Sequence, residues 1–405
     1  MVAEKYQDYV HNLIRQVLDE IGPRPSCSEA ERKLGRLLVR EWMPVCDAVT
    51  MESFRCSPQA FLGFLPLAVL AYFAAVILYW LYPPASPAMA AVSLSLVFFE
   101  LVRYREFVDF LFPRKKGWNV TGVIRPRGEA RQRVIVSAHQ DSAYEFRLWY
   151  HLGTAAVWLT ALAGAAIVFI LAGGIARALA WFGGSEGAMA YTAMGIVAIA
   201  LSPVVGLFLF FKSGRAVPGA MDDMAGVAVV SGLARYLDDA RHDGSFFPRS
   251  TEVVLLATSA EEAGLRGAKR YAEKHMAEMR QKPTYALFLD GIYDERLLTV
   301  TDSELFTGAR HDAGLVRLAQ ESAAGRGWPI RKRWIPLGGT DASAFSLRGI
   351  PAVCLHCQDT SRLVSNYHTR HDTLENIRPR SLSVSLQMVI DMIERLDAGH
   401  AESGG

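Results

Sequence analysis

The stretch TEVVLLATSAEEAG, residues 251–264, decides the fold class of this chain. Its first half is an almost unbroken apolar run, which is typical of a strand buried on both faces of a sheet. Glu261 and Glu262 follow that strand, and a helical pattern begins at Gly264. A buried strand followed by a polar turn and a helix indicates an α/β sheet, in which ligand sites lie at the carboxyl ends of the strands.

The same arrangement recurs on both sides of this stretch. Further apolar strands are expected at 133–139, 284–292 and 350–356, and helices at 224–240, 264–279, 311–323 and 380–396. This alternation predicts a three-layer α/β/α fold with a mostly parallel central sheet. Nearer the N-terminus, the apolar spacing from Tyr6 to Ile21 predicts a helix that ends at Gly22. Ser28 and Glu31 have the spacing of a capping box for the next helix.

Four long apolar stretches interrupt the alternation. We expect helices there at about 61–82, 85–102, 153–175 and 188–211. Each stretch approaches or exceeds the roughly 18–20 residues that cross a bilayer, and only the second contains an acid, Glu100. Hydrophobic residues make up 51% of the chain and its mean hydropathy is +0.15, which favours membrane helices over buried core helices. The sequence therefore predicts four inserted transmembrane helices in two hairpins.

The charges beside these stretches predict an orientation. Four crossings leave all soluble pieces and both termini on one side, and the opposite loops contain only Arg177 as a basic residue. The soluble side carries Arg103, Arg105, Arg114, Lys115, Lys116, Arg147, Lys212 and Arg215. Positive-inside bias therefore predicts a multi-pass inner-membrane protein whose soluble domain and termini are cytoplasmic. No apolar run begins the chain, so a cleavable signal peptide is not expected.

Composition narrows the classes of partner and compartment. The formal net charge is +2 and no basic run is interleaved with aromatics, so no nucleic-acid partner is expected. Five cysteines at irregular spacing favour reduced thiols over a disulfide framework. Cys354 and Cys357 form a single CxxC pair at a strand end, for which neither a redox role nor a structural zinc is favoured.

Five polar clusters lie at strand ends or helix starts. They are 137–141 with His139 and Asp141, 219–226 with Asp222 and Asp223, 259–264 with Glu261 and Glu262, 289–291 with Asp290, and 367–373 with His368. Each alone has a structural explanation, since an acid pair before a helix also caps it. Together they supply two imidazoles, three carboxylates and one further Glu, which suits two metal ions that share a carboxylate beside an unligated base.

On these clusters the chain resembles the co-catalytic dizinc aminopeptidases of the bacterial leucyl-aminopeptidase type, which are zinc exopeptidases. The resemblance covers residues 1–56, 117–145 and 216–397, and includes the opening Gly22-Pro-Arg-Pro25. It implies a peptidase domain divided by membrane hairpins. The expected pieces are N-terminal helices at 1–56, a hairpin at 57–112, a piece with the first ligand at 113–150, a second hairpin at 151–212, the main part at 213–397 and a flexible tail at 398–405.

The resemblance also implies a role for each site residue. His139 and Asp290 are expected to bind one zinc, Glu262 and His368 the other, and Asp222 both. Co²⁺ or Mn²⁺ are possible substitutes for Zn²⁺ at such ligands.

Three more residues receive expected catalytic or positioning roles. Glu261 is the general base and acid, Asp141 orients His139, and Tyr367 donates to the oxyanion. The sequence Gly338-Gly-Thr-Asp341 resembles a family loop near the substrate pocket, with a simple turn as the alternative.

Other activities of the same fold remain open at this stage. A carboxypeptidase or amide deacylase is the main alternative to an aminopeptidase, with Arg331–Arg333 as candidate carboxylate binders. A glutaminyl cyclase uses one zinc and does not need both His139 and Asp290. An inactive receptor or scaffold would lack ligands, and a transporter would carry more intramembrane charge than Glu100.

The chain length between the clusters and the apolar stretches predicts where the site lies. About a dozen residues separate His139 from the third stretch, and about ten separate the fourth from Asp222. Such links reach at most ~35–40 Å, so we expect the site near the membrane surface. The expected partners are therefore peptide substrates at the inner leaflet, the lipid bilayer and, through small residues in the helices, a possible homodimer.

Overall fold

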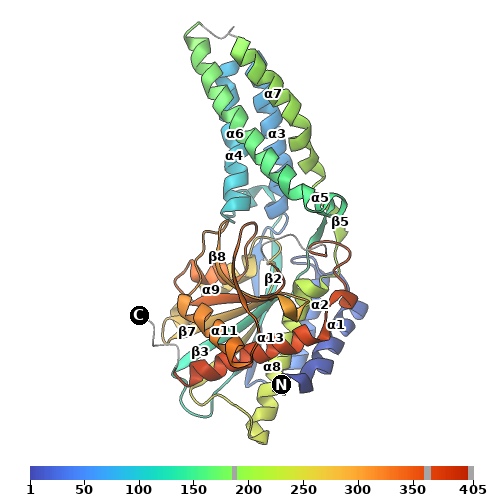
Figure 1. The fold of residues 1–405 in the computed structure, drawn as a ribbon, viewed down its shortest axis with the longest axis vertical. Coiled ribbons are helices and arrows are strands. Elements are labelled where there is room, and N and C mark those ends of the chain that lie inside the picture. Colours follow the sequence, from blue (N-terminus) through green and yellow to red (C-terminus); the bar gives the residue numbers. More distant parts are fainter. Residues whose placement is uncertain (185–188, 360–365, 400–405) are drawn as a thin grey trace. The chain divides into compact units, whose positions relative to one another are not determined.

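The structure is a computed structural model that describes residues 1–184, 189–359 and 366–399 (Figure 1). Residue contacts divide the chain into two compact units. The sheet unit comprises Met1–Pro58, Arg114–Tyr144 and Ala216–Gly405, and the helical unit comprises Gln59–Pro113 and Glu145–Arg215. The expected helix start at 188 and the tail from residue 400 onward lie outside the described residues.

An eight-stranded sheet forms the centre of the sheet unit, in the order β1-β2-β6-β3-β7-β10-β8-β9. Its four middle strands are parallel: β6 (Thr251–Thr258), β3 (Gln132–His139), β7 (Thr284–Ile292) and β10 (Ala352–Cys357). Antiparallel pairing adds β2 (Lys115–Ile124) and β1 (Ala48–Cys56) on one side, and β8 (Leu298–Glu304) on the other, where β9 (Arg331–Ile335) pairs parallel to β8. The parallel strands bring their carboxyl ends to one edge of the sheet.

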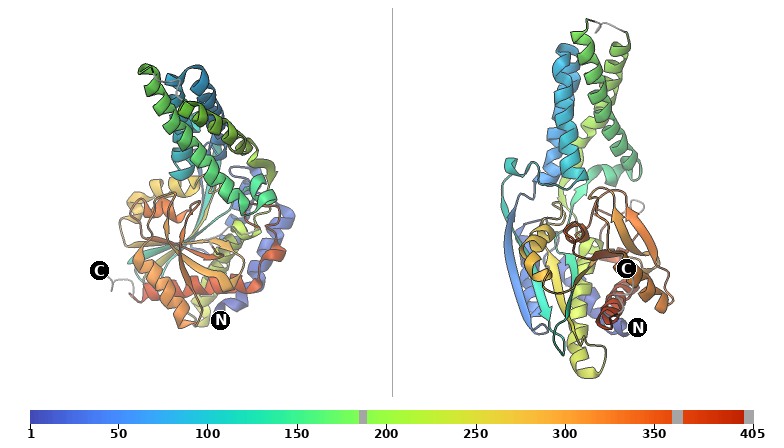
Figure 2. Two further views of the ribbon diagram at one scale, coloured as in Figure 1. Left: turned by 45° about the horizontal axis from the view of Figure 1, so that its top comes forward. Right: turned by 90° about the vertical axis from the view of Figure 1, so that its left-hand side faces the viewer.

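Helices cover both faces of this sheet (Figures 1 and 2). One layer contains α1 (Gln7–Glu20), α2 (Glu29–Trp42), α8 (Ala225–Asp243), α11 (Ala313–Gly325) and α13 (Pro379–Asp397). The other contains α9 (Arg266–Lys274), α10 (Met276–Met279) and α12 (Ala342–Ser346). Side chains alternate between the two cores, since Val134 and Val136 pack in the first and Ile135 in the second. The expected three-layer α/β/α class is confirmed.

The outer strands β1, β2, β8 and β9 carry no strand prediction from the sequence. Strand β9 has four exposed residues before its buried Ile335, and β1 alternates between exposed and half-buried positions. These two strands form the edges of the sheet, where a strand buries too little apolar surface to produce a strong pattern, whereas β2 and β8 lie inside the sheet and are mostly buried. The helix expected at 264–279 divides into α9 and α10, because the α-helical hydrogen-bond pattern is interrupted at His275.

The helical unit contains four helices that are long and apolar enough to cross a membrane. They are α3 (Ala60–Leu81), the run Pro83–Val102 that includes α4 (Ser86–Leu96), α6 (Ala155–Phe182), and the run Met189–Phe210 that begins with α7 (Met189–Gly206). The third helix extends seven residues beyond the expected end at 175. The short helix α5 (Arg147–Leu152) and strands β4 (Tyr144–Phe146) and β5 (Lys212–Ala216) complete the description.

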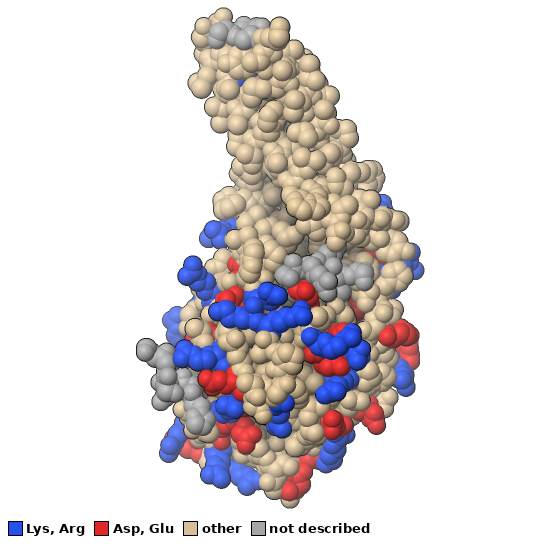
Figure 3. Space-filling model, viewed as in Figure 1, with Lys and Arg blue, Asp and Glu red and all other residues tan. Residues whose placement is uncertain are grey.

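Polar side chains inside the helical unit bond to neighbouring backbone. Tyr72 donates to the Ala198 oxygen at 3.0 Å, which links the two hairpins, and Ser93 donates to the Ala68 oxygen at 2.8 Å within the first hairpin. Glu100, the acid noted in the second stretch, accepts from the Val108 amide at 2.6 Å. The face of this unit seen in Figure 3 is nearly free of charged residues, and exposed large hydrophobic side chains of the unit include Trp158, Leu179 and Ile196. This pattern suits helices surrounded by lipid.

Candidate metal centre

Four of the five expected ligands meet at the carboxyl edge of the sheet. His139 ends β3, Glu262 follows β6, and Asp222 lies in the turn before α8. Nε2 of His139 lies 3.0 Å from Oδ1 of Asp222. Nε2 of His368 lies 3.1 Å from Oδ2 of Asp222 and 3.2 Å from Oε1 of Glu262. Asp222 therefore presents one oxygen to each imidazole.

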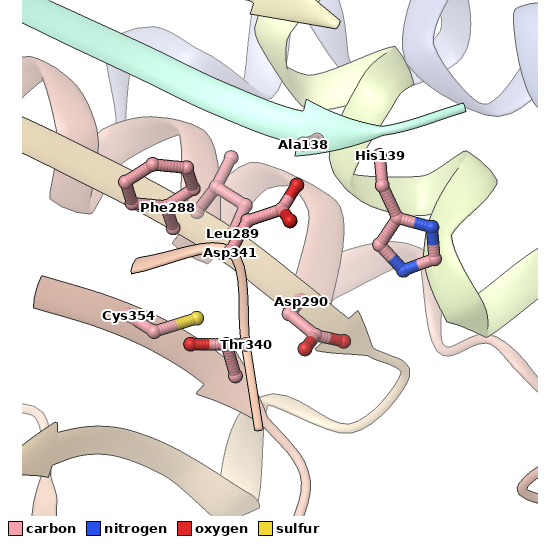
Figure 4. Close-up of a pocket in the computed structure, with 8 residues that line it drawn as sticks. All are labelled: Ala138, His139, Phe288, Leu289, Asp290, Thr340, Asp341 and Cys354. Carbon is pink, nitrogen blue, oxygen red and sulfur yellow. The ribbon is translucent and has the colours of Figure 1, made fainter. Parts of the chain in front are cut away.

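Asp290, the fifth expected ligand, extends from β7 beside this group. Figure 4 shows its carboxylate between the His139 ring and the Cys354 thiol, in a small cavity that Thr340 and Asp341 also line. One carboxylate oxygen of Asp290 lies within 4.8 Å of possible ligand atoms of Cys354 and His356. His139, Asp222 and Glu262 form a separate group by the same distance. Asp290 thus lies at the border between two sets of ligand-type side chains.

Asp141 holds the His139 ring and the Glu261-Glu262 turn together. The Nδ1 atom of His139 lies 3.2 Å from the backbone oxygen of Asp141 and 3.5 Å from its carboxylate. The same carboxylate accepts from the amides of Glu261 and Glu262 at 3.0 and 3.1 Å, and from the Ser26 hydroxyl at 2.6 Å. Such a partner fixes which nitrogen of a ligating imidazole is presented to a metal.

Two further carboxylates shape the turn that carries Asp222. Asp372 accepts from the amides of Met221 and Asp222 at 2.6 and 3.2 Å. Asp223 accepts from the Gly226 amide at 3.0 Å and the His139 amide at 3.3 Å. A Cβ on Gly226 would lie 2.5 Å from the Asp223 carboxylate, so only glycine fits this close approach. The glycine at position 226 therefore has a steric reason.

Negative charge accumulates at this edge beyond what the imidazoles balance. Burial and the charge of Asp222 raise the pKa of Asp290 to about 8. Burial likewise raises the pKa of Asp341 to about 7 and that of Glu261 well above its usual range. Burial opposes the charged form of His368, but the carboxylates of Glu262 and Asp222 outweigh it and raise its pKa to about 10. A set of carboxylates this destabilised favours a bound cation.

The described residues fit zinc on two grounds. Oδ2 of Asp222 and Oε1 of Glu262 are buried beside the His368 ring, 3.1 and 3.2 Å away, and no other hydrogen-bond donor meets them within the described chain, which leaves lone pairs for a cation. One ligand atom each of His139, Asp222 and Glu262 lie within 4.8 Å of one another. Imidazole nitrogen and carboxylate oxygen are the donors that zinc takes in hydrolytic sites.

Glu261 and Tyr367 lie next to these ligands in sequence and in space. The charges of His139 and Glu262 act on the buried Glu261 carboxylate. The Tyr367 ring stacks on the His368 ring, with centroids 3.9 Å apart and planes 19° apart. His368 has a φ of +52°, a conformation that side chains other than glycine seldom adopt. Such strain at a candidate ligand is typical of residues whose direction is fixed by function.

Arg24 is a residue at the site whose role the sequence does not reveal. Its fully buried guanidinium donates to four backbone oxygens: those of Gln140 at 3.1 Å, Gly22 at 2.8 Å, Pro218 at 3.0 Å and Gly219 at 2.9 Å. These oxygens belong to the N-terminal segment, the turn after His139 and the turn before Asp222. The only signal for Arg24 is its place in the Gly22-Pro-Arg-Pro25 opening.

Glu31, expected in a capping box, forms only half of one. Ser28 accepts from the Glu31 amide at 3.1 Å, as expected. The Glu31 carboxylate turns instead to the amides of Cys27 at 2.7 Å and Ala260 at 3.0 Å. It therefore supports the strained residue before the Glu261-Glu262 turn, since Ala260 has a φ of +57°.

A buried network under the Gly338–Asp341 loop also escapes sequence analysis. Glu304, at the end of β8, accepts from Thr340 at 2.6 Å, from the ring of His311 at 3.2 Å and from Ser343. Asp341 in turn accepts from Thr258 at 2.5 Å. These bonds hold the loop against the cavity that contains Asp290, so the expected turn is a fixed wall of the site.

Other residues singled out from the sequence lie elsewhere. Arg331–Arg333 are exposed on β9, with Arg331 3.7 Å from Asp359. His371, in the 367–373 cluster, is exposed. Cys354 and Cys357 belong to different cores, and the Cys357 sulfur lies 3.3 Å from the Ser385 hydroxyl, so they do not form a thiol pair.

Part of the chain that carries this site also matches a known sequence family. Residues 205–393 match Peptidase family M28. That range includes the Asp222 turn, the Glu261-Glu262 turn, Asp290 and His368. The predicted resemblance to a peptidase family is therefore confirmed for this part of the chain. No curated protein sequence matches this chain significantly.

Solved structures share the fold over most of the chain. BSAP, a zinc aminopeptidase from Bacillus subtilis, is 15% identical with a TM-score of 0.56, and the match covers 96% of this chain and 94% of that one. LapB from Legionella pneumophila is 12% identical with a TM-score of 0.56, over 98% and 74%. An Acidobacteriales bacterium glutaminyl cyclase is 14% identical with a TM-score of 0.55, over 97% and 95%. At these identities the likeness shows a shared fold alone, and the neighbours named here include enzymes of two activities.

Proposed function

We propose that this protein is a membrane-embedded dizinc aminopeptidase that removes N-terminal residues from peptides at the cytoplasmic membrane surface. The observation that carries the proposal is Asp222 with one carboxylate oxygen toward each of two histidines, 3.0 and 3.1 Å away. A carboxylate placed in this way suits a bridge between two ions. Glu261 lies beside it without a ligand role.

The proposed ligand sets follow from this arrangement. His139 and Asp290 hold one zinc, Glu262 and His368 hold the other, and Asp222 binds both. When bound, zinc lowers the pKa of a water toward neutrality and polarises a carbonyl oxygen. Co²⁺ or Mn²⁺ can replace zinc at nitrogen and oxygen donors.

Glu261 is proposed to move the proton. Burial keeps its pKa well above the usual range, so the carboxylate has the basicity to accept a proton from the attacking water. It then returns that proton to the leaving amine nitrogen. Asp141 positions His139 and, through two amide bonds, the Glu261 backbone. Tyr367 is proposed to donate its hydroxyl hydrogen to the oxyanion.

The excess of carboxylates favours an aminopeptidase within this fold. A substrate's free ammonium group is attracted to the edge where Glu261, Asp290 and Asp341 gather, whereas a substrate carboxylate is repelled. The candidate carboxylate binders Arg331–Arg333 lie exposed on β9. A carboxypeptidase or deacylase is therefore the less favoured activity.

A glutaminyl cyclase is the second candidate, because a cyclase shares the fold at a TM-score of 0.55. A single zinc would not require His139 and Asp290 in addition to Glu262 and His368. An inactive receptor or scaffold would not retain this full ligand set with its base.

The membrane part of the proposal rests on the four long apolar helices. We propose that they cross the inner membrane with the sheet unit and both termini in the cytoplasm, since the basic residues flank that side. The chain linking them to the clusters is short, which favours substrates at the inner leaflet. A homodimer through the helices belongs to the same proposal.

The test combines metal counting with substrate choice. Wild type and Glu261→Ala are purified in detergent, metals per chain are counted, and hydrolysis of an aminoacyl amide is compared with that of its N-acetylated form. We expect two zinc ions in both proteins, hydrolysis of the free amine only, and a rate in Glu261→Ala lower by about 10²–10⁴-fold. Glu394→Gln, exposed on α13, is the matched control and retains the wild-type rate.

Each contrary result points to another activity. One zinc per chain with cyclisation of an N-terminal glutamine supports the cyclase. Cleavage of the N-acetylated substrate supports the deacylase or carboxypeptidase. A normal rate in Glu261→Ala contradicts the proposed base.

A further inference from the structure

A second group of ligand-type side chains lies on the far side of Asp290 from the histidines. Cys354 and His356 occupy alternate positions of β10, so they face the same side of the sheet. Strand β7 pairs parallel to β10, with Phe288 opposite Cys354, and this register brings Asp290 near His356. One ligand atom from each of Asp290, Cys354 and His356 lies within 4.8 Å of the other two.

His356 is a buried histidine beside Asp290 and Cys354. Only 1% of the residue is exposed, and neither ring nitrogen makes a hydrogen bond to the described residues. An imidazole without partners in a protein core is unfavourable by a few kcal/mol, so such a group indicates a ligand.

Cys354 lies beside this ring with a fully buried thiol. Its sulfur lies 4.0 Å from the Leu355 backbone oxygen and next to the Thr340 hydroxyl in the same cavity (Figure 4). The neighbouring hydroxyl of Thr301, opposite Cys354 on β8, is also buried and accepts or donates no hydrogen bond within the described chain. The His356 ring and the Thr301 hydroxyl are thus two buried polar groups without a hydrogen bond in the described chain, and with the nearby cavity at Asp290 and Cys354 they point to a bound species.

We propose that Asp290, Cys354 and His356 form an additional site for a thiophilic divalent cation such as Zn²⁺. Sulfur, imidazole nitrogen and carboxylate oxygen are the three donor types that zinc accepts, and water completes a four-coordinate ion. The Cys354 thiol releases its proton to solvent as the cation binds. Mg²⁺ and Mn²⁺ prefer oxygen donors and are excluded by this set.

The site gives zinc a regulatory effect on the proposed peptidase. Asp290 is shared with the ligand set of one catalytic zinc, a step that rests on the proposed function. A cation held by Cys354 and His356 draws the Asp290 carboxylate toward itself. Excess Zn²⁺ therefore inhibits hydrolysis, whereas excess Mn²⁺ does not.

Cys357 provides a matched control three residues away. It is as buried as Cys354, but it belongs to the opposite core and its sulfur lies 3.3 Å from the Ser385 hydroxyl. The substitution Cys357→Ser replaces a thiol by a hydroxyl, as Cys354→Ser does, but on the other face of β10. The Cys357 side chain alternates to the opposite face of β10 from Cys354 and His356.

The decisive measurement is cobalt titration of the metal-free full chain in detergent, followed by ultraviolet absorption. A Co²⁺–thiolate bond gives a charge-transfer band that nitrogen and oxygen ligands do not. We expect the band in wild type and in Cys357→Ser, and its loss in Cys354→Ser. His356→Gln should weaken the cobalt affinity measured by this band at least about tenfold. Circular dichroism confirms that each variant is folded.

No thiolate band in wild type, or a band that persists in Cys354→Ser, overturns the proposal. The ratio of hydrolysis rates at low and at excess zinc is the second readout, and it should approach one in Cys354→Ser but not in Cys357→Ser. The cobalt band does not require turnover. A band without peptidase activity therefore refutes only the proposed function, and activity without a band refutes only this site.

Discussion

Arg24 offers the strongest test of how the metal centre is assembled. Its guanidinium donates to four backbone oxygens, from Gly22, Gln140, Pro218 and Gly219. Arg24→Lys retains the charge but replaces a planar fork by an ammonium with three donors. At least one of the four buried oxygens therefore loses its partner.

The expected loss of stability follows from these bonds. A hydrogen bond to a charged group contributes about 1.5–3 kcal/mol, and a buried group without its partner costs about 1–3 kcal/mol. We expect Arg24→Lys to lower the free energy of unfolding of the sheet unit by about 2–4 kcal/mol. That corresponds to a fall in Tm of roughly 4–10 °C.

Metal affinity should fall as well. The turns after His139 and before Asp222 share Arg24 as an anchor, so its loss lets the two candidate ligands move apart. Residues that orient metal ligands typically change affinity by about 10–100-fold, and we expect that range for zinc. Zinc affinity measured with a competing chelator, together with thermal unfolding in detergent, checks both effects.

Arg15→Lys, exposed on α1, makes the same chemical change at the surface and should alter neither quantity. If Arg24→Lys keeps the wild-type Tm and zinc affinity, the four bonds do not hold the site and the reasoning fails. A fall in Tm with unchanged zinc affinity would limit Arg24 to a structural role.

Two further outcomes are expected. Burial opposes the charge of Glu304, but its bonds to His311 and Ser343 outweigh burial and lower its pKa. The charged carboxylate therefore contributes its full stability above the ordinary pKa of 4.5, and this contribution is lost as the pH falls below that value. The acid-induced loss of Tm should be smaller in Glu304→Gln than in wild type, and equal losses would contradict this prediction. A cysteine at Phe182, exposed at the end of α6, should react with an impermeant maleimide on spheroplasts, whereas a cysteine at Glu394 should react only after lysis; the reverse pattern would invert the proposed topology.

The sequence alone determined the layered fold and the four apolar helices. Buried parallel strands and helices such as 251–258 and 225–243 have strong periodic patterns, because their side chains pack against a core on fixed faces. The two strands at the edges of the sheet, β1 and β9, were not predictable, because they bury few residues. Their places depend on pairing with strands distant in sequence.

Sequence also placed His139, Asp222, Glu262 and His368 in the candidate site, because ligand-type residues at strand ends and turns meet at one edge of a parallel sheet. What holds them was decided by tertiary structure. Arg24 binds oxygens 116 and 195 residues away in the chain, and nothing in the local pattern of an arginine specifies which carbonyls it meets.

The same physical reason separates the two cysteines. Their CxxC spacing suggested a pair, yet alternation along β10 sends Cys354 and Cys357 to opposite cores. Parallel pairing with β7 then brings Asp290 to Cys354 and His356. Local sequence determines which face a side chain takes, and only the register between distant strands decides which groups it meets there.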